Sequence, residues 1–321
     1  MDILSKINKS NLCGRGGANF SVYLKWLAVK NATNTTKYVI CNAAESELLV
    51  NKDGYILSKY PEAVVDGMFL AINFLKAKEG IIYLKPEYYK KLSKQLTKLI
   101  GNRPISLFKK TGSYLCGEET TLLNDIEGKR KEPRMRPPFP TISGLWDCPT
   151  LVNNVETFYY ISKIANDNYN STHFITIAGD TKNKGTFELP LNLSINNILK
   201  NTNNFPKFNF FVQINGGASG EFLIQDNLNK KLNGTGSIII YNTKKTNKLK
   251  LLKKIVDYFH QENCDKCVPC REGVYRIHEM LKNKNINQEV IDDLLFTMKN
   301  TSFCALGKSV STPLNSLMNI K

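Results

Sequence analysis

The chain has 321 residues, and its 44 lysines and arginines against 28 aspartates and glutamates give a formal net charge of +16 at pH 7. This length is enough for two or three domains. The charge favours anionic partners, but no basic stretch with interleaved aromatic residues is present, so no nucleic-acid binding is expected. No apolar run has the length of a signal peptide or a membrane span, and we expect no direct membrane insertion.

Residues 1–168 are predicted to form an α/β domain. Three short apolar runs are typical of strands: Tyr38–Cys41, Ile81–Leu84 and Ile105–Phe108. Pro61 and Pro86 each begin a stretch in which apolar residues recur at helical spacing. Alternating strands and helices indicate a mainly parallel sheet covered by helices, where ligands bind beyond the carboxyl ends of the strands.

A glycine cluster near the start carries the first chemical signal. Gly14-Arg15-Gly16-Gly17 leads directly into a helical pattern that contains Lys25. Backbone N–H groups beside a helix N-terminus and a lysine can bind a phosphate. Alone this signal is weak, because glycines cluster at many turns. It is also not the dinucleotide fingerprint, since no strand precedes it and the spacing differs.

Residues 169–245 have a different character and are predicted to form a small α+β domain. Their β runs, separated by glycine-bearing turns, are Phe174–Ile177, Phe208–Val212 and Ser237–Ile240. A lysine-rich linker then leads into a helical tail, residues 246–321, that holds a cysteine cluster.

Cys264, Cys267 and Cys270 share one short loop, and Cys304 follows 34 positions after the last of them. Three thiolates on a loop and one remote thiolate suit a 4Fe-4S cluster. Zinc is the alternative, although structural zinc usually takes cysteines as two separated pairs. Four buried free thiols are a third possibility. The remaining cysteines are read as the free thiols of a reducing compartment: Cys13, Cys41, Cys116 and Cys148.

Several motifs occur in a characteristic order along the chain. They are Gly14–Ala18, Leu24–Trp26, Cys41–Ala43, Lys52–Asp53, Tyr114–Thr120, Pro137–Pro140, Ser143–Trp146, Val152–Thr157 and Cys267–Gly273. The set resembles the NADH-binding flavoprotein subunit of respiratory complex I, a module shared with NAD-reducing hydrogenases and formate dehydrogenases. The chain departs from the family pattern at Ala28, Ala44 and Arg136, where an aromatic residue, an acidic residue and a lysine are usual. The usual N-terminal extension is also expected to be missing.

The resemblance implies a Rossmann-like FMN domain over residues 1–168, a ubiquitin-like β-grasp domain over 169–245, and a helical bundle over 246–321 whose four loop and remote cysteines bind one 4Fe-4S cluster. It implies a flavin site formed by Gly14, Arg15, Gly16, Gly17, Lys25, Asn42, Glu45, Ser46, Tyr114, Gly117, Glu118, Asn153, Asn154 and Thr157.

For NADH, the resemblance implies that Phe20 and Phe139 stack on adenine, that Glu47 accepts from a ribose hydroxyl, and that Glu119 lies beside the nicotinamide. Arg136 completes the nucleotide-binding set, and Glu45 and Glu119 are the candidate catalytic residues. Without the motif context, each phenylalanine would be read as a core residue and each glutamate as a solvated charge.

Three functions remain in competition. The first is oxidation of NADH by FMN, with single electrons passed to the cluster. The second keeps both cofactors but takes electrons from an acidic protein such as ferredoxin or flavodoxin. The third is a structural subunit without catalysis, which the retained cysteines and glycine loop disfavour. By resemblance, the expected partners are a thioredoxin-like 2Fe-2S subunit and a larger iron–sulfur subunit. The expected location is cytoplasmic, held at the inner face of the membrane through these partners.

Overall fold

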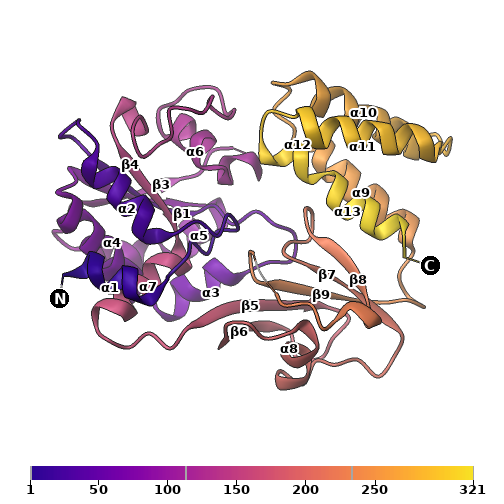
Figure 1. Cartoon of the computed structure of the whole chain (residues 1–321), viewed down its shortest axis with the longest axis horizontal. Coiled ribbons are helices and arrows are strands. Elements are labelled where there is room, and N and C mark those ends of the chain that lie inside the picture. The colour runs from indigo at the N-terminus through magenta and orange to yellow at the C-terminus, as the bar shows by residue number, and fades with distance from the viewer. Residues whose placement is uncertain (1, 113, 233, 321) are drawn as a thin grey trace. The chain divides into compact units, whose positions relative to one another are not determined.

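The computed structural model describes residues 2–112, 114–232 and 234–320. The chain divides into two compact units. Unit 1 comprises Met1–Ser46, Asn51–Phe174 and Glu188–Leu191, and unit 2 comprises Glu47–Val50, Ile175–Phe187 and Asn192–Lys321. Figure 1 shows the elements of both units, coloured along the chain from indigo to yellow.

Unit 1 contains a four-stranded sheet in the order β3-β2-β1-β4. Its strands are β1 (Tyr38–Ala43), β2 (Glu79–Leu84), β3 (Ile105–Lys109) and β4 (Thr150–Asn154). All three neighbouring pairs are parallel, and the strands predicted from the apolar runs are confirmed. The chain moves outward from β1 to β3 and returns on the other side of β1. The strand order therefore reverses between β1 and β4, where sheets of this kind leave a crevice for ligands.

Seven helices and two 3-10 turns accompany this sheet within the described part of unit 1. They are α1 (Ile3–Ser10), α2 (Val22–Asn31), α3 (Lys52–Lys59), α4 (Pro61–Leu75), α5 (Pro86–Ile100), η1 (Tyr114–Gly117), α6 (Glu119–Ile126), η2 (Leu145–Asp147) and α7 (Val155–Ala165). Pro61 and Pro86 begin α4 and α5, as predicted. A proline is well tolerated there because its missing N–H would have no intrahelical partner.

Both faces of the sheet are covered, as Figure 1 shows for α4 and α7 on one side and α6 on the other. Alternation along β1 sends Val39 and Cys41 into the core beneath α4 and α7, and sends Tyr38 and Ile40 toward the apolar side chains of α6. Strands buried on both faces are apolar at nearly every position, which explains why short continuous runs predicted them.

Unit 2 contains a five-stranded sheet in the order β6-β5-β9-β7-β8. Its strands are β5 (Thr172–Gly179), β6 (Gly185–Pro190), β7 (Phe210–Ile214), β8 (Glu221–Ile224) and β9 (Ser237–Asn242). The central pair β5 and β9 is parallel, and β7 is antiparallel to both β8 and β9. β5, β7 and β9 confirm the predicted β runs, with β7 beginning two residues later than expected.

The remaining elements of unit 2 are helical. They are α8 (Ile195–Asn201), η3 (Gln225–Asn227), α9 (Lys248–Gln261), α10 (Val268–Lys282), α11 (Gln288–Thr301), α12 (Ala305–Ser309) and α13 (Ser311–Met318). The N–H of Phe222 in β8 donates to Oγ of Ser316 in α13 at 2.9 Å, which ties this helix to the sheet. Within residues 2–112, 114–232 and 234–320, every helix is too short or too polar to cross a lipid bilayer.

Candidate functional site

The carboxyl ends of β1 and β4 bring three distant motifs together. Asn42 on β1 stands in register with Asn154 on β4. The Asn42 amide donates to the carbonyl oxygen of Gly117 at 2.9 Å, so the η1 turn lies against the end of the sheet. The predicted flavin residues of all three motifs therefore meet at the point where the strand order reverses.

The glycine loop packs on the same edge. It is closed by the Gly14 N–H, which donates to the carbonyl oxygen of Phe20 at 2.8 Å. The Arg15 N–H donates to the Thr157 hydroxyl at 3.0 Å, in the first turn of α7. A Cβ placed on Gly16 would lie 3.3 Å from the Cβ of Asn154, closer than ordinary side-chain contacts. A side chain at this position would require Asn154 to shift by a few tenths of an ångström, so the loop and β4 are closely packed here.

Charged side chains line the start of α6. The Lys25 ammonium lies 2.9 Å from Oε2 of Glu119, and Arg136 contacts Glu118 and lies 3.4 Å from Glu119. Glu118 also caps α6, accepting from the N–H of Thr120 at 3.0 Å. Lys25, predicted on the flavin side, and Glu119, predicted on the nicotinamide side, are thus direct neighbours.

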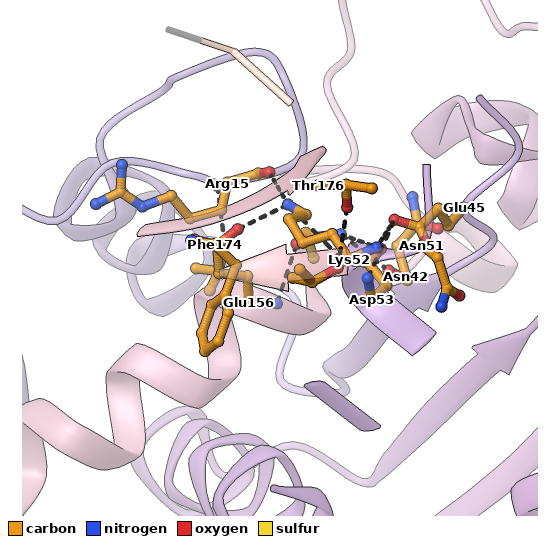
Figure 2. Close-up of polar contacts among 12 residues, drawn as sticks. Arg15, Asn42, Glu45, Asn51, Lys52, Asp53, Glu156, Phe174 and Thr176 are labelled. Carbon is orange, nitrogen blue, oxygen red and sulfur yellow. Dashed lines mark hydrogen bonds and ion pairs between the residues drawn. The ribbon is translucent and has the colours of Figure 1, made fainter. Parts of the chain in front are cut away.

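Beneath the glycine loop lies a buried polar cluster around Lys52, drawn in Figure 2. The side chains of Lys52 and Glu156 are 4% and 2% exposed, and their charged atoms are 2.7 Å apart. The Lys52 ammonium also donates to the carbonyl oxygen of Arg15 at 2.8 Å and lies 3.8 Å from Asp53. Asp53 in turn accepts from the Asn154 amide at 2.7 Å. Lys52 and Asp53 belong to one of the ordered motifs, but the sequence alone indicated no role for them.

The cluster shifts the protonation of its members. Burial raises the pKa of Asp53 above its usual range, and the nearby charge of Glu45 raises it further. Burial alone would lower the pKa of Lys52, but the charges of Glu156 and Asp53 outweigh it, so that pKa is raised. Lys52 is therefore held as a cation, while Asp53 has an increased tendency to keep a proton.

Glu45, a predicted catalytic residue, has both carboxylate oxygens engaged within the protein. One accepts from the N–H groups of Lys52 and Asp53 at 2.9 and 3.0 Å, at the start of α3. The other accepts from the Tyr88 hydroxyl. In this structure Glu45 anchors the N-terminus of α3. Its proposed contact with flavin stays a prediction.

Ser46 has a charged neighbour, Lys110, that the sequence did not predict. The Lys110 ammonium, buried at the end of β3, donates to Oγ of Ser46 at 2.6 Å. The Ser46 hydroxyl donates in turn to the carbonyl oxygen of Ala44. Lys110 follows another lysine in an unremarkable polar stretch, so no local signal in the sequence distinguishes it.

The predicted nucleotide residues differ in their surroundings. Phe20 and Phe139 are 54% and 51% exposed, so neither is a core residue. Glu47 belongs to unit 2, where its carboxylate accepts from the Ala218 N–H at 3.0 Å and from the Ser219 hydroxyl. Its side chain is thus already bound to the glycine-bearing turn of that unit.

The four cluster cysteines lie on the helical tail as thiols rather than disulfides. Cys267 precedes α10, Cys270 lies in its first turn, and Cys304 precedes α12. Burial, followed by the charges of Cys267, Cys304 and Cys264, raises the pKa of the Cys270 thiol to about 12. Cys264, Cys267 and Cys304 therefore lie within electrostatic reach of Cys270.

This donor set fits an iron–sulfur cluster. Zinc would hold all its sulfurs about 2.3 Å from one ion, whereas a 4Fe-4S cube places each thiolate on a separate iron. A bound metal favours the thiolate form of its cysteine ligands and would offset the raised pKa of Cys270. The chemistry of the set suits iron and sulfide, and Cys264 completes it from the preceding loop.

Two family models match the chain. Residues 7–163 match the Nuo51 FMN-binding domain, and residues 250–320 match the iron–sulfur binding region of NADH-ubiquinone oxidoreductase F. The first match contains the glycine loop, the ends of β1 and β4, and the start of α6. The second contains all four cluster cysteines.

The chain is similar to the F subunit of NADH-quinone oxidoreductase of Buchnera aphidicola subsp. Schizaphis graminum, with 32% identity over 98% of this chain and 81% of that protein. It is 33% identical to the NAD-reducing hydrogenase HoxS subunit alpha of Cupriavidus necator, over 97% of this chain and 58% of that subunit. Its fold is similar to a crystal structure of an NAD+-reducing [NiFe]-hydrogenase, with a TM-score of 0.91 and 26% identity over 98% of this chain. It spans 60% of that crystallised chain.

Proposed function

Because the chain belongs to the family of NADH-quinone oxidoreductase F subunits, we propose that it binds FMN and one 4Fe-4S cluster and oxidises NADH as the electron-input subunit of a larger redox complex. One observation carries the proposal. The glycine loop, the ends of β1 and β4, and the start of α6 are far apart in the sequence, and they meet at the strand-order reversal.

The flavin would lie along this edge, with its phosphate at the glycine loop. The Gly16 N–H has no acceptor among the described residues and is available to an anion. Asn42, Asn153 and Asn154 offer amides that both donate and accept, which suits the ribityl chain and the ring. Tyr114 and Gly117 would border the ring from η1. Ser46 and Thr157 complete the set.

When bound, FMN supplies acceptance of a hydride from NADH and release of electrons one at a time. The role of the protein is to bind and orient the two partners. Phe20 and Phe139 present exposed rings on which an adenine can stack. Arg136 and Lys25, beside Glu118 and Glu119, offer positive charge to phosphates while the glutamates face the nicotinamide side. We propose Glu119 as the residue next to the reacting carbon and Glu45 as the residue that fixes the neighbouring helix.

Cys264, Cys267, Cys270 and Cys304 are proposed as the cluster ligands, each bound to one iron. We also propose three domains: residues 1–168 for FMN, a β-grasp domain over 169–245 and a helical cluster domain over 246–321. The parallel central pair β5 and β9, flanked by β6 on one side and the antiparallel β7 and β8 on the other, supports the β-grasp assignment.

The proposed partners are a thioredoxin-like 2Fe-2S subunit and a larger iron–sulfur subunit, which would hold the chain at the cytoplasmic face of a membrane. A second candidate function is electron entry from an acidic donor protein. It is favoured by the net charge of +16 and by the engagement of Glu47 with Ala218 and Ser219, since that carboxylate is not free to select a ribose.

The two functions are separated by the reduction of ferricyanide with NADH as the electron source. We expect the reconstituted protein to catalyse it, and we expect Phe139→Ala to weaken the apparent affinity for NADH by up to about tenfold, the scale of one aromatic stacking contact. Phe205→Ala is the matched control, because Phe205 is also exposed but lies in unit 2. No turnover with NADH together with turnover on reduced ferredoxin would favour the donor-protein function.

A further inference from the structure

We propose that Lys52 is a positioning residue for the flavin phosphate. Its buried ammonium fixes the peptide between Arg15 and Gly16, so that the Gly16 N–H is presented to the phosphate. This inference rests on the proposed function, because it assumes that FMN binds at the glycine loop. It gives a role to the Lys52–Asp53 motif, which is assigned no direct contact with flavin or nucleotide.

Arg15 is held on both sides of its Cα. Its N–H donates to the Thr157 hydroxyl at 3.0 Å, and its carbonyl oxygen accepts from the Lys52 ammonium at 2.8 Å. The first bond comes from α7 and the second from α3, so two separate helices set the orientation of the loop. Figure 2 shows Lys52 between Arg15 and the carboxylates.

The peptide geometry transmits this constraint to Gly16. A peptide unit is planar and normally trans, so its carbonyl oxygen and the following N–H point in opposite directions. The Arg15 carbonyl points at Lys52, and the Gly16 N–H therefore points away from the cluster. Within the described ranges no acceptor takes that N–H. A free donor held in one orientation is what an anion-binding loop requires.

Two hydrogen bonds and a second nearby carboxylate offset the cost of burying Lys52. An ammonium has three donors, and here they face the Arg15 carbonyl, Glu156 at 2.7 Å and Asp53 at 3.8 Å. Glu156 is itself held by the Phe174 N–H at 3.0 Å, and Asp53 by Asn154 at 2.7 Å. A buried ion pair is weak evidence for stability alone, since well-packed apolar residues often serve as well. The link to the loop carbonyl gives this one a functional reason.

The proposal separates Lys52 from Lys25. Lys25 is partly exposed and can meet a phosphate directly. Lys52 is closed off from solvent and acts only through the peptide it holds. Its loss should therefore affect ligands that carry the phosphate and spare those that lack it.

The test compares FMN with riboflavin, which has the same ring and ribityl chain but no phosphate. The affinity of each for the full-length apoprotein is measured by quenching of flavin fluorescence. We expect Lys52→Met to weaken FMN binding by about 10- to 100-fold, the range of a hydrogen bond to a charged group, and to change riboflavin binding little. Lys52→Arg should retain the preference for FMN. Lys59→Met, at the exposed end of the same helix, is the control and should match the wild type.

Equal weakening of FMN and riboflavin by Lys52→Met would overturn the inference while leaving the proposed function intact. Failure of the wild type to bind FMN would overturn both. Lys52→Met leaves Glu156 buried without its cation, so the double variant Lys52→Met/Glu156→Gln is measured as well. If the double variant keeps the wild-type preference for FMN, Lys52 is not the positioning residue. If it loses the preference while remaining folded, the inference stands.

Discussion

The ammonium of Lys25 lies 2.9 Å from Oε2 of Glu119, although the two residues are 94 positions apart in the chain. Lys25 projects from α2, which follows the glycine loop, and Glu119 is the first residue of α6. Their side chains are about one-fifth exposed, so solvent screens the pair only in part. The contact links the loop proposed for the flavin phosphate to the residue proposed to face the nicotinamide.

Replacing Glu119 with glutamine should tighten FMN binding by a factor of about two to five, the scale of a partly exposed ion pair. The reason is that the Lys25 ammonium no longer shares its charge with a carboxylate and interacts more strongly with phosphate. Flavin fluorescence titration measures the effect. In a Lys25→Ala background the same substitution should leave the affinity for FMN unchanged. Equal effects on that affinity in both backgrounds would mean that the two residues act independently.

Gly16→Val should abolish flavin binding. A Cβ at this position already approaches Asn154 to 3.3 Å, and the two γ-methyl groups of valine would displace the loop from β4. Flavin content after reconstitution, read from the visible spectrum, tests this. Gly128→Asn is the control, since Gly128 has an open position and a φ of 69° that asparagine tolerates. Normal flavin content in Gly16→Val would show that the phosphate binds elsewhere.

Anaerobically reconstituted protein should contain about four irons per chain. Cys304→Ser should lose most of this iron, because the remote ligand closes the fourth corner of the cube. Cys13→Ser should keep it, since Cys13 lies in the glycine-loop region of unit 1. Iron and zinc are counted by elemental analysis. One zinc and no iron would contradict the assignment of the four cysteines.

Stability should fall as the pH drops from about 6.5 to 4. Burial, with the charges of Arg15 and Lys52, lowers the pKa of His173 to about 4, so the folded protein keeps this imidazole neutral while the unfolded chain protonates it. The unfolded state then binds more protons, and the full shift corresponds to about 3 kcal/mol. The free energy of unfolding is measured by chemical denaturation at several pH values. In His173→Leu it should fall less steeply with decreasing pH than in the wild type. An unchanged slope would contradict the assignment.

The sheet of unit 1 could be predicted from the sequence for a physical reason. β1 and β2 are buried on both faces and read as continuous apolar runs, and prolines mark the first residues of α4 and α5. The short helix α3 was not predicted, because its first residues, Lys52 and Asp53, are charged and yet buried. Their burial depends on Glu156, 104 positions away from Lys52, and no local periodicity reports such a pairing.

The site shows the same division. The ordered motifs predicted that the glycine loop, the asparagines and the start of α6 belong to the site, since each is a short segment with recognisable residues. The connections between them could not be read from the chain. Lys25 with Glu119, Lys110 with Ser46, and the engagement of Glu47 by unit 2 all join residues from distant segments.

The central claim, that NADH delivers its electrons to a flavin at the β1–β4 edge, is tested by adding NADH anaerobically to the FMN- and iron-replete protein. We expect the flavin absorbance band to bleach, and we expect Glu119→Gln or Phe139→Ala to require more NADH for the same bleaching. A flavin band that stays unchanged at millimolar NADH, yet bleaches with reduced ferredoxin, would contradict the account and identify a protein as the electron donor.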